Sequence, residues 1–245
     1  MGPRSGRGWR TRNDPLRGRR SALRAEVGYW EDWVARRGGK WADEYKSRFD
    51  PAAEVWDPAL REVLREIPHD DVSILDVGAG PASTVGCRFP GKLLSIVAID
   101  PLADSYTRVL AQAGVVPPVR TERLEGERLV ERFGRERFDI AYARNALDHA
   151  IDPTVIIEQM LDVVSVGGYV VLRHVRNEAV RQAYGQLHQW NFEERDGQLI
   201  VWRVGHQTAV GDLLDGRGEM TCRTGPTDET GAASVVCIVR KTAAA

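Results

Sequence analysis

The feature that most constrains the fold is an apolar run that leads into a turn of small residues, Ile74-Leu75-Asp76-Val77-Gly78-Ala79-Gly80-Pro81-Ala82. A short apolar run of this kind is typical of a buried strand, and glycines in the turn let the backbone approach a ligand with no Cβ in the way. A second apolar run ends at Asp100, twenty residues after Gly80. An acid in this place can accept hydrogen bonds from both hydroxyls of a ribose, as in doubly wound nucleotide folds.

Strands and helices alternate from residue 72 onward. The predicted strands are Ser73–Val77, Leu94–Asp100, Val119–Arg123, Phe138–Ala143, Tyr169–His174, Glu219–Thr224 and Ser234–Arg240. Helices are predicted between them at Ala103–Ala113, Glu127–Phe133 and Pro153–Val163. Apolar strands that alternate with helices indicate an α/β fold, in which right-handed crossovers wind a parallel sheet.

The link after the fifth predicted strand, residues 175–205, is unusually long. We expect it to contain a helix, Glu178–Leu187, and a hairpin formed by Trp190–Glu194 and Gln198–Arg203. Asp196-Gly197 predicts the turn of this hairpin, since both positions of such a turn favour residues that tolerate positive φ.

The first part of the chain differs in composition from the rest. Residues 1–24 hold eight Arg against one Asp, a charge of +7, so with a total of −1 the remaining residues carry −8. Such an Arg/Gly/Ser/Pro-rich stretch buries little apolar surface, and we expect a disordered basic tail. A nucleic-acid arm is the alternative, but an acidic body would repel phosphate. Residues 25–68 are predicted to be a helical cap, which the aromatic residues of this segment fasten to the core.

Several classes of protein are excluded. No apolar run approaches the ~20 residues of a membrane span, and the basic start is not followed by the apolar core of a secretory signal. Cys87, Cys222 and Cys237 are too widely spaced for a zinc motif or an obvious disulfide framework, which fits a reducing cytoplasm. We therefore expect a cytoplasmic protein.

Two nucleoside cofactors compete for the glycine loop. A dinucleotide fingerprint requires G-x-G-x-x-G, but Ser83 stands where the last glycine should be. Pro81 and Gly86 also weaken the helix whose N-terminus would hold a pyrophosphate. S-adenosylmethionine has a ribose and an adenine but no phosphate, so it suits this loop better.

The motifs, in this order, resemble those of the class I S-adenosylmethionine-dependent methyltransferases, in the branch that acts mostly on small molecules. Asp76–Gly80 resembles the D/E-x-G-x-G motif, with Ala82 where many members have a third glycine. Leu124–Leu129 is similar to the segment in which an acid and a backbone amide hold the adenine. Phe138–His149 resembles the fourth strand and its exit loop, and Val166–Leu172 resembles the turn into the fifth strand.

The resemblance implies a Rossmann-like, doubly wound sheet of seven strands that is mostly parallel with an antiparallel last strand. Residues 69–245 would form the cofactor-binding domain, in which 175–205 is a lid insertion. The cofactor would be S-adenosylmethionine. The residues implied to bind it are Asp76, Gly78, Ala79, Gly80, Asp100, Pro101, Glu125, Gly126 and Asn145.

The chemistry should lie just after the fourth and fifth strands, because open α/β sheets bind ligands beyond the carboxyl ends of their strands. The polar candidates there are Arg144, Asn145, Asp148, His149, His174, Arg176 and Asn177. For a hydroxyl acceptor, the protein must remove a proton, and an imidazole titrates near neutral pH. His149 is therefore the first catalytic candidate and His174 the second, although a histidine in such a position can also serve only for packing or capping.

The same place offers candidate ligands for a metal ion. Asp148, His149 and Asp152 carry side chains that suit a divalent ion. Adjacent residues usually point in different directions, so we predict no bound metal.

The cover over the acceptor must come from outside the core sheet. The aromatic N-terminal segment and the 175–205 insertion are available, and aromatic side chains suit a pocket for a small organic molecule. Arg48, Arg144 and Trp190 are the predicted acceptor-binding residues.

The sequence thus predicts methyl transfer to oxygen or nitrogen of a small organic acceptor, with secondary metabolism as one setting. The alternatives are an RNA methyltransferase that uses the basic arm and a non-catalytic cofactor-binding relative. We expect a small-molecule acceptor as the partner, without nucleic acid or membrane, and a homodimer remains open.

Overall fold

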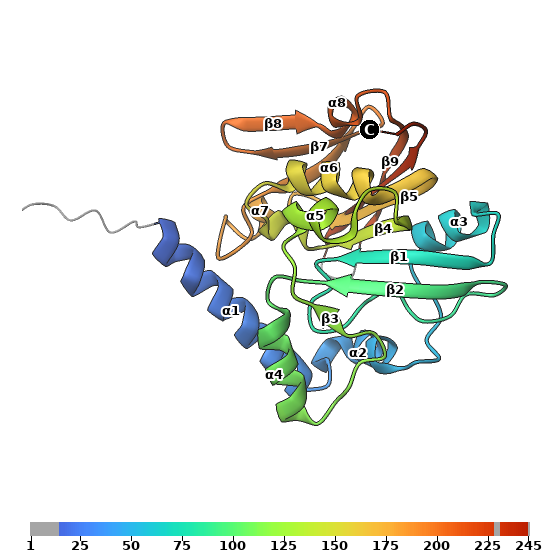
Figure 1. Cartoon of the computed structure of the whole chain (residues 1–245). Coiled ribbons are helices and arrows are strands. Elements are labelled where there is room, and N and C mark those ends of the chain that lie inside the picture. Colours follow the sequence, from blue (N-terminus) through green and yellow to red (C-terminus); the bar gives the residue numbers. More distant parts are fainter. Residues whose placement is uncertain (1–14, 228–230, 245) are drawn as a thin grey trace, which may run out of the picture.

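A computed structural model describes the backbone of residues 15–227 and 231–244. A seven-stranded sheet runs through its centre in the order β3-β2-β1-β4-β5-β10-β9 (Figure 1). Its strands are β1 (Asp71–Val77), β2 (Leu93–Ile99), β3 (Thr121–Glu122), β4 (Phe138–Arg144), β5 (Val164–Val175), β9 (Gly218–Thr227) and β10 (Ala233–Lys241). β10 runs antiparallel to both β5 and β9, whereas the pairs among β1 to β5 are parallel. The predicted fold class is confirmed.

β3 is shorter than the predicted strand Val119–Arg123, since only Thr121 and Glu122 pair with β2. Pro117 and Pro118 come just before it. Proline has no N–H to donate to a neighbouring strand, so it limits pairing at this sheet edge.

Helices cover both faces of the sheet. On one face, α3 (Pro58–Glu66) packs on apolar side chains of β1, β4, β5 and β10. Asp57 starts this helix by accepting hydrogen bonds from the backbone N–H groups of Ala59 and Leu60. The other face packs against α5 (Leu129–Phe133) and α6 (Pro153–Val163). Because successive side chains of a strand point to opposite faces, the central strands supply both halves of the core.

The N-terminal helices form a separate apolar cluster. It joins α1 (Pro15–Ala35), a 3₁₀ turn at Gly39–Trp41 and α2 (Ala42–Phe49) to α4 (Ala103–Ala113). Trp33, Val34, Val109 and Leu110 are its buried members. Figure 1 shows α1 and α4 side by side at one edge of the molecule, away from β9.

The predicted disordered tail over residues 1–24 is wrong for residues 15–24, which belong to α1. The part before residue 15 lies outside the described residues. Arg, Leu and Ala are good helix formers, and Ala22 is buried. Composition alone missed this helix, because a few apolar residues at suitable spacing are enough to attach an Arg-rich helix to the core.

The insertion after β5 differs from the predicted lid. The predicted helix Glu178–Leu187 is shortened to α7 (Glu178–Arg181), because Ala183, Tyr184 and Gln186 adopt positive φ and end the helical path. The predicted hairpin is confirmed as β6 (Asn191–Arg195) and β7 (Gln198–Arg203).

A third strand, β8 (His206–Ala209), extends this hairpin to a small sheet and is followed by α8 (Val210–Leu214). Phe192, Leu199 and Val201 of this sheet are buried in the same cluster as α6. The small sheet is therefore part of the core. Of the insertion, Val175 at the end of β5 and the segment 178–188 line the cavity described below. No helix among the described residues is long and apolar enough to cross a membrane.

Candidate functional site

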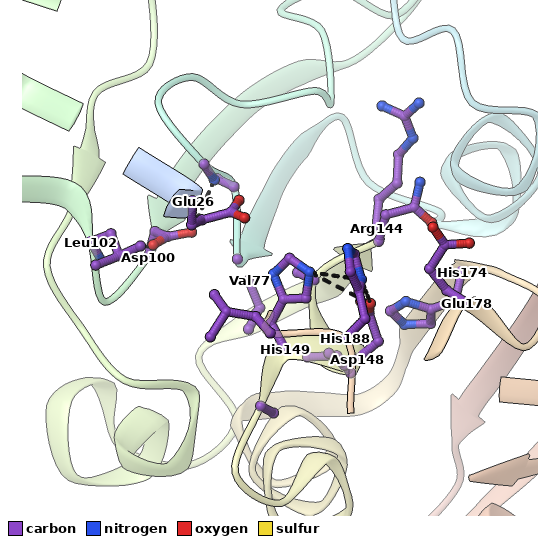
Figure 2. A pocket seen from close by; sticks show the side chains of 18 of the residues that line it. Glu26, Val77, Asp100, Leu102, Arg144, Asp148, His149, His174, Glu178 and His188 are labelled. Carbon is purple, nitrogen blue, oxygen red and sulfur yellow. Dashed lines mark hydrogen bonds and ion pairs between the residues drawn. The ribbon is translucent and has the colours of Figure 1, made fainter. Parts of the chain in front are cut away.

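A cavity of about 980 Å³ lies at the carboxyl ends of β1, β2, β4 and β5. Its floor is the glycine loop after β1, and its walls include α1 and the segment 178–188. Small-molecule sites range from about 300 to about 1,000 Å³. The cavity is at the upper end of this range, so it can hold two small ligands together. Figure 2 shows Glu26 and Asp100 on one side of it, and Asp148, His149, His174 and His188 on the other.

The glycine loop requires glycine at both predicted positions. Gly78 has φ +74°, and a Cβ there would lie 2.3 Å from the Cβ of Ala146. Gly80 has φ +67°, and a Cβ there would lie 3.1 Å from the ring of Trp30. The amides of Gly78 and Ala79 donate to the carbonyl of Ile99 at 2.9 and 3.0 Å, which fixes the loop across the ends of β1 and β2.

Asp100 lies at the end of β2 as predicted, and its carboxylate faces the glycine loop. Oδ2 accepts a hydrogen bond from the Gly80 amide at 3.1 Å, and Oδ1 accepts one from the Leu102 amide at 2.8 Å. Burial raises the pKa of Asp100 to about 6. Each oxygen keeps a further lone pair for a ligand hydroxyl.

Glu26 is a site residue that the sequence reasoning missed. It lies on α1 and lines the cavity, and it accepts a hydrogen bond from Nε1 of Trp30 at 2.8 Å. Its negative charge adds to the effect of burial in raising the pKa of Asp100. Only the path of α1, whose first residues the sequence predicts to be disordered, brings it to the side of the cavity that holds Asp100.

Asp76 and Arg48 stabilise the glycine loop and the residues that follow it through hydrogen bonds. Asp76 is buried and accepts a hydrogen bond from Oγ of Ser83 at 2.7 Å, and burial raises its pKa. Arg48 donates to the carbonyls of Ala79 and Ala82 at 3.3 and 2.7 Å. The guanidinium of Arg48 also pairs with Glu44 at 2.7 Å. These contacts use Arg48 to hold the loop in place and not, as predicted, to bind the acceptor.

The remaining predicted cofactor residues also line the cavity. Pro101, Glu125 and Gly126 lie on the side of Asp100, and Gly126 packs so closely on Ile156 that a Cβ would come within 2.9 Å of it. Asn145 adopts a left-handed conformation with φ +48°, and its Oδ1 accepts a hydrogen bond from the Val175 amide at 2.9 Å. Asn145 thereby ties the end of β4 to the end of β5.

Asp148, His149 and His188 meet on the other side of the cavity (Figure 2). Nδ1 of His188 lies 2.6 Å from Oδ2 of Asp148 and 3.1 Å from Nε2 of His149. Nε2 of His149 lies 3.6 Å from Oδ2 of Asp148. Burial would raise the pKa of Asp148, but His149, His188 and, to a lesser extent, His174 outweigh it and lower that pKa. Asp152, in contrast, caps α6 by accepting from the amide of Thr154.

His174 lies beside this group at the end of β5. Only 2% of its surface is exposed, and its ring stacks on Phe192 with centroids 4.2 Å apart. Neither ring nitrogen has a hydrogen-bond partner within residues 15–227 and 231–244. Burial lowers the pKa of His174 to about 4, so its imidazole is neutral at pH 7.

Arg144 lies in the cavity wall on the side of His174 (Figure 2). Its Nη1 donates to Oε1 of Glu44 at 3.1 Å, and its guanidinium lies 4.7 Å from the ring centre of Trp56. Its Nε is buried and has no partner among the described residues. Arg173 stands next to it on β5 and lies over the same ring.

Three of the sequence candidates lie outside the cavity wall. Trp190 is buried in the core, where its Nε1 donates to the Ile151 carbonyl at 3.3 Å, so packing replaces the predicted contact with the acceptor. Asn177 pairs with Glu193 and accepts from Nε1 of Trp202. Arg176 lies 3.7 Å from Glu193. These contacts hold the small sheet to the end of β5.

The seven-stranded sheet, the glycine loop and the acid after β2 together define a class I methyltransferase fold. The model of the methyltransferase domain family matches residues 28–218, and the chain belongs to this family. It is therefore an S-adenosylmethionine-dependent methyltransferase, and S-adenosylmethionine is its cofactor.

A solved structure supports the fold. The chain is similar to the 1,6-didemethyltoxoflavin-N1-methyltransferase of Burkholderia thailandensis, which was solved with 1,6-didemethyltoxoflavin and S-adenosylhomocysteine bound. The identity is 16%, the TM-score is 0.52, and the match covers 92% of this chain and 91% of the other. A methyltransferase from Methanosarcina mazei is 20% identical with a TM-score of 0.48, over 76% of this chain and 98% of that one. None of the curated sequences compared with the chain matches it.

Proposed function

We propose that this methyltransferase moves the methyl group to an oxygen or nitrogen atom of a small organic acceptor. The observation that carries the proposal is that one cavity joins the glycine loop and Asp100 to the group formed by Asp148, His149 and His188. The first side offers contacts for a nucleoside, and the second offers groups that can take up a proton. Its volume of about 980 Å³ suits two small molecules.

The cofactor would lie over the glycine loop. The ribose hydroxyls would donate to Asp100, whose oxygens each have a free lone pair. Glu125 and the amide of Gly126 would hold the adenine, while the backbone of Gly78–Gly80, Pro101 and Asn145 would line the rest. Asp76 and Glu26 would place negative charge near the cationic sulfonium, which such charge attracts strongly where water is scarce.

The acceptor would lie between α1, the segment 178–188 and the ends of β4 and β5. Methyl transfer is an in-line displacement at the carbon bound to sulfur, so the protein must chiefly align the acceptor and exclude water. A hydroxyl acceptor must also lose its proton. We assign this task to the side that carries His149 and His174, with Arg144 in the wall beside them.

Methyl-labelled S-adenosylmethionine tests the proposal. The purified chain is incubated with a panel of small hydroxyl and amine compounds and, separately, with total RNA. We expect label in at least one small compound, and at least tenfold slower transfer in Asp100→Asn. The control is His69→Ala, which alters a His–Asp pair at the amino ends of β1 and β4, outside the cavity wall. Label that enters RNA alone, or no label with any acceptor although the cofactor binds, would contradict the proposal.

A further inference from the structure

We propose that Asp148, His149 and His188 bind a divalent first-row transition metal ion that holds the acceptor by an oxygen atom. This inference rests on the proposed function, since it gives the acceptor side of the same cavity a specific chemistry. It differs from the prediction made from the sequence, which is that no metal is bound. The sequence reasoning assumed that Asp148 and His149 point apart, but their ligand atoms lie 3.6 Å from each other.

The spacing of the three atoms fits one ion. Oδ2 of Asp148, Nδ1 of His188 and Nε2 of His149 lie 2.6, 3.1 and 3.6 Å apart. Ligands at about 2.1 Å from an ion lie about 3.0–3.4 Å from one another at octahedral or tetrahedral angles. A small relaxation of the side chains would place all three at bonding distance from a common centre.

A proton relay fits this arrangement less well. In a relay, the middle imidazole uses one ring nitrogen toward the carboxylate and the other toward the next group. Here, the same atom, Nδ1 of His188, faces both Asp148 and His149. Three lone-pair atoms that converge on one point are the arrangement that a cation stabilises.

The backbone holds the ligands in place from two distant segments. Asp148 and His149 lie in a 3₁₀ turn after β4, and His188 lies in the insertion after β5. The carbonyl of Asp148 accepts hydrogen bonds from the amides of Gln189 and Trp190 at 3.0 and 3.3 Å. The two segments are thus joined next to the ligands themselves, which is how a preorganised metal site is supported.

His174 is a second, independent observation that points to a ligand. Its ring is buried, both ring nitrogens lack a partner among the described residues, and it lines the same cavity. It interacts electrostatically with Asp148 and His149. A buried polar group without a partner destabilises the folded state. A water or an acceptor atom bound to the ion would supply the missing partner.

The ligand set indicates the kind of ion. Two imidazoles and one carboxylate suit Mn²⁺, Fe²⁺, Co²⁺, Ni²⁺ or Zn²⁺, and three protein ligands leave positions open for an acceptor, as in catalytic metal sites. The cavity reaches Asp148, His149 and His188, so the open positions would face the acceptor.

The ion would favour an acceptor with a hydroxyl group. Coordination lowers the pKa of the hydroxyl, and its proton passes to water. A lone pair of that oxygen then forms the new bond to the methyl carbon while the carbon–sulfur bond breaks, and the sulfonium becomes a neutral thioether. The predicted substrate class is therefore a small hydroxyl compound.

Cobalt titration of the chelator-treated protein tests the inference, because Co²⁺ bound to nitrogen and oxygen ligands absorbs visible light. We expect one ion per chain in the wild type, and binding at least tenfold weaker in His188→Ala and in Asp148→Asn. His69→Ala is the matched control, because His69 lies 3.1 Å from Asp139, and this pair has no third metal-ligating side chain nearby within the described part of the chain. Melting temperature and S-adenosylhomocysteine binding show that each variant is folded.

Equal Co²⁺ affinity in the wild type and His188→Ala, or an equal loss in His69→Ala, would overturn the inference. Methyl transfer gives a second readout, since a chelator should abolish it and Mn²⁺, Zn²⁺ or Co²⁺ should restore it. An unchanged rate in the chelated protein overturns the metal site but leaves the proposed function intact. Failure to bind S-adenosylhomocysteine, in contrast, counts against the proposed function whatever the cobalt result.

Discussion

If Asp100 binds the ribose as proposed, we expect cofactor binding to depend on pH. Its pKa of about 6 means that the carboxylate is ionised at pH 7 and mostly protonated at pH 5. A protonated carboxyl accepts ribose hydroxyls poorly, so the affinity for S-adenosylhomocysteine should fall about tenfold between pH 7 and pH 5. Calorimetric titration at several pH values measures this. Asp100→Asn should bind more weakly at pH 7 and show a nearly flat profile, and an equally steep profile in this variant would contradict the assignment.

The same residue has the opposite effect on the stability of the ligand-free protein. A raised pKa means that the folded state binds the proton more tightly than the unfolded state does. The free energy of unfolding should therefore fall as the pH rises from about 4 to about 6. Asp100→Asn removes this contribution.

Gly78 and Gly91 offer a matched test of the close approach at the glycine loop. Both have φ near +75°, but a Cβ at Gly91 meets nothing within 4 Å, whereas one at Gly78 lies 2.3 Å from Ala146. Gly91→Ala should lower the free energy of unfolding by about 1–2 kcal/mol through backbone strain alone. Gly78→Ala should cost about 1–3 kcal/mol more through overpacking. Urea unfolding measures the free energy of unfolding of both variants. Equal losses in the two variants would show that the backbone around Gly78 relaxes to accommodate a Cβ.

The site residues differ in how far the sequence predicts them. Gly78, Gly80 and Asp100 are set by local spacing around two strand ends, so their places can be predicted from the sequence alone. His188 reaches Asp148 only because the insertion folds back across forty positions, and no local pattern records that path. Trp190 shows the reverse error, because an aromatic residue near the site packs into the core.

At the scale of elements, α1 is attached through an apolar cluster of its own. Few apolar contacts and an exposed outer face favour local opening, so amides of α1 should exchange with deuterium faster than those of β4. S-adenosylhomocysteine should slow exchange in α1, because Glu26 and Trp30 lie over the glycine loop. Hydrogen exchange with mass spectrometry measures this. α3 is the control, since it lies outside the cavity wall and should not respond; equal slowing in α3 would contradict the prediction.

Elements with a strong local signal could be predicted from the sequence. Ala103–Ala113 and Pro153–Val163 are found where their patterns place them, and Asp196-Gly197 marks the turn of the hairpin. The start of α1 could not be predicted, since its burial depends on contacts with the rest of the molecule. The third strand of the small sheet, β8, could not be predicted either. It is short and mostly polar, so its sequence carries no strand signal apart from its pairing with β7.

At the scale of the whole molecule, cofactor binding should raise stability. The ligand binds the folded state, so at one hundred times its Kd it adds about 2.7 kcal/mol to the free energy of unfolding. For a chain of this size that is a rise in Tm of roughly 5–10 °C. Thermal unfolding with increasing S-adenosylhomocysteine measures the shift. Asp100→Asn should show a smaller shift at equal ligand concentration, and a Tm that does not move at saturation would contradict a preformed site.

The route of the segment 178–188 has a consequence for how this enzyme can change. The segment leaves the sheet at the end of β5 and returns to β6, whose first residues are fixed in the core. It contributes to the acceptor side of the cavity, whereas the cofactor side is built from the loops after β1 and β2. Under the proposed placement of the two ligands, this stretch contacts the acceptor together with α1 and the ends of β4 and β5, whereas the loops after β1 and β2 contact the cofactor. Exchanging this one stretch should redirect the enzyme to new acceptors while its S-adenosylmethionine chemistry is inherited unaltered.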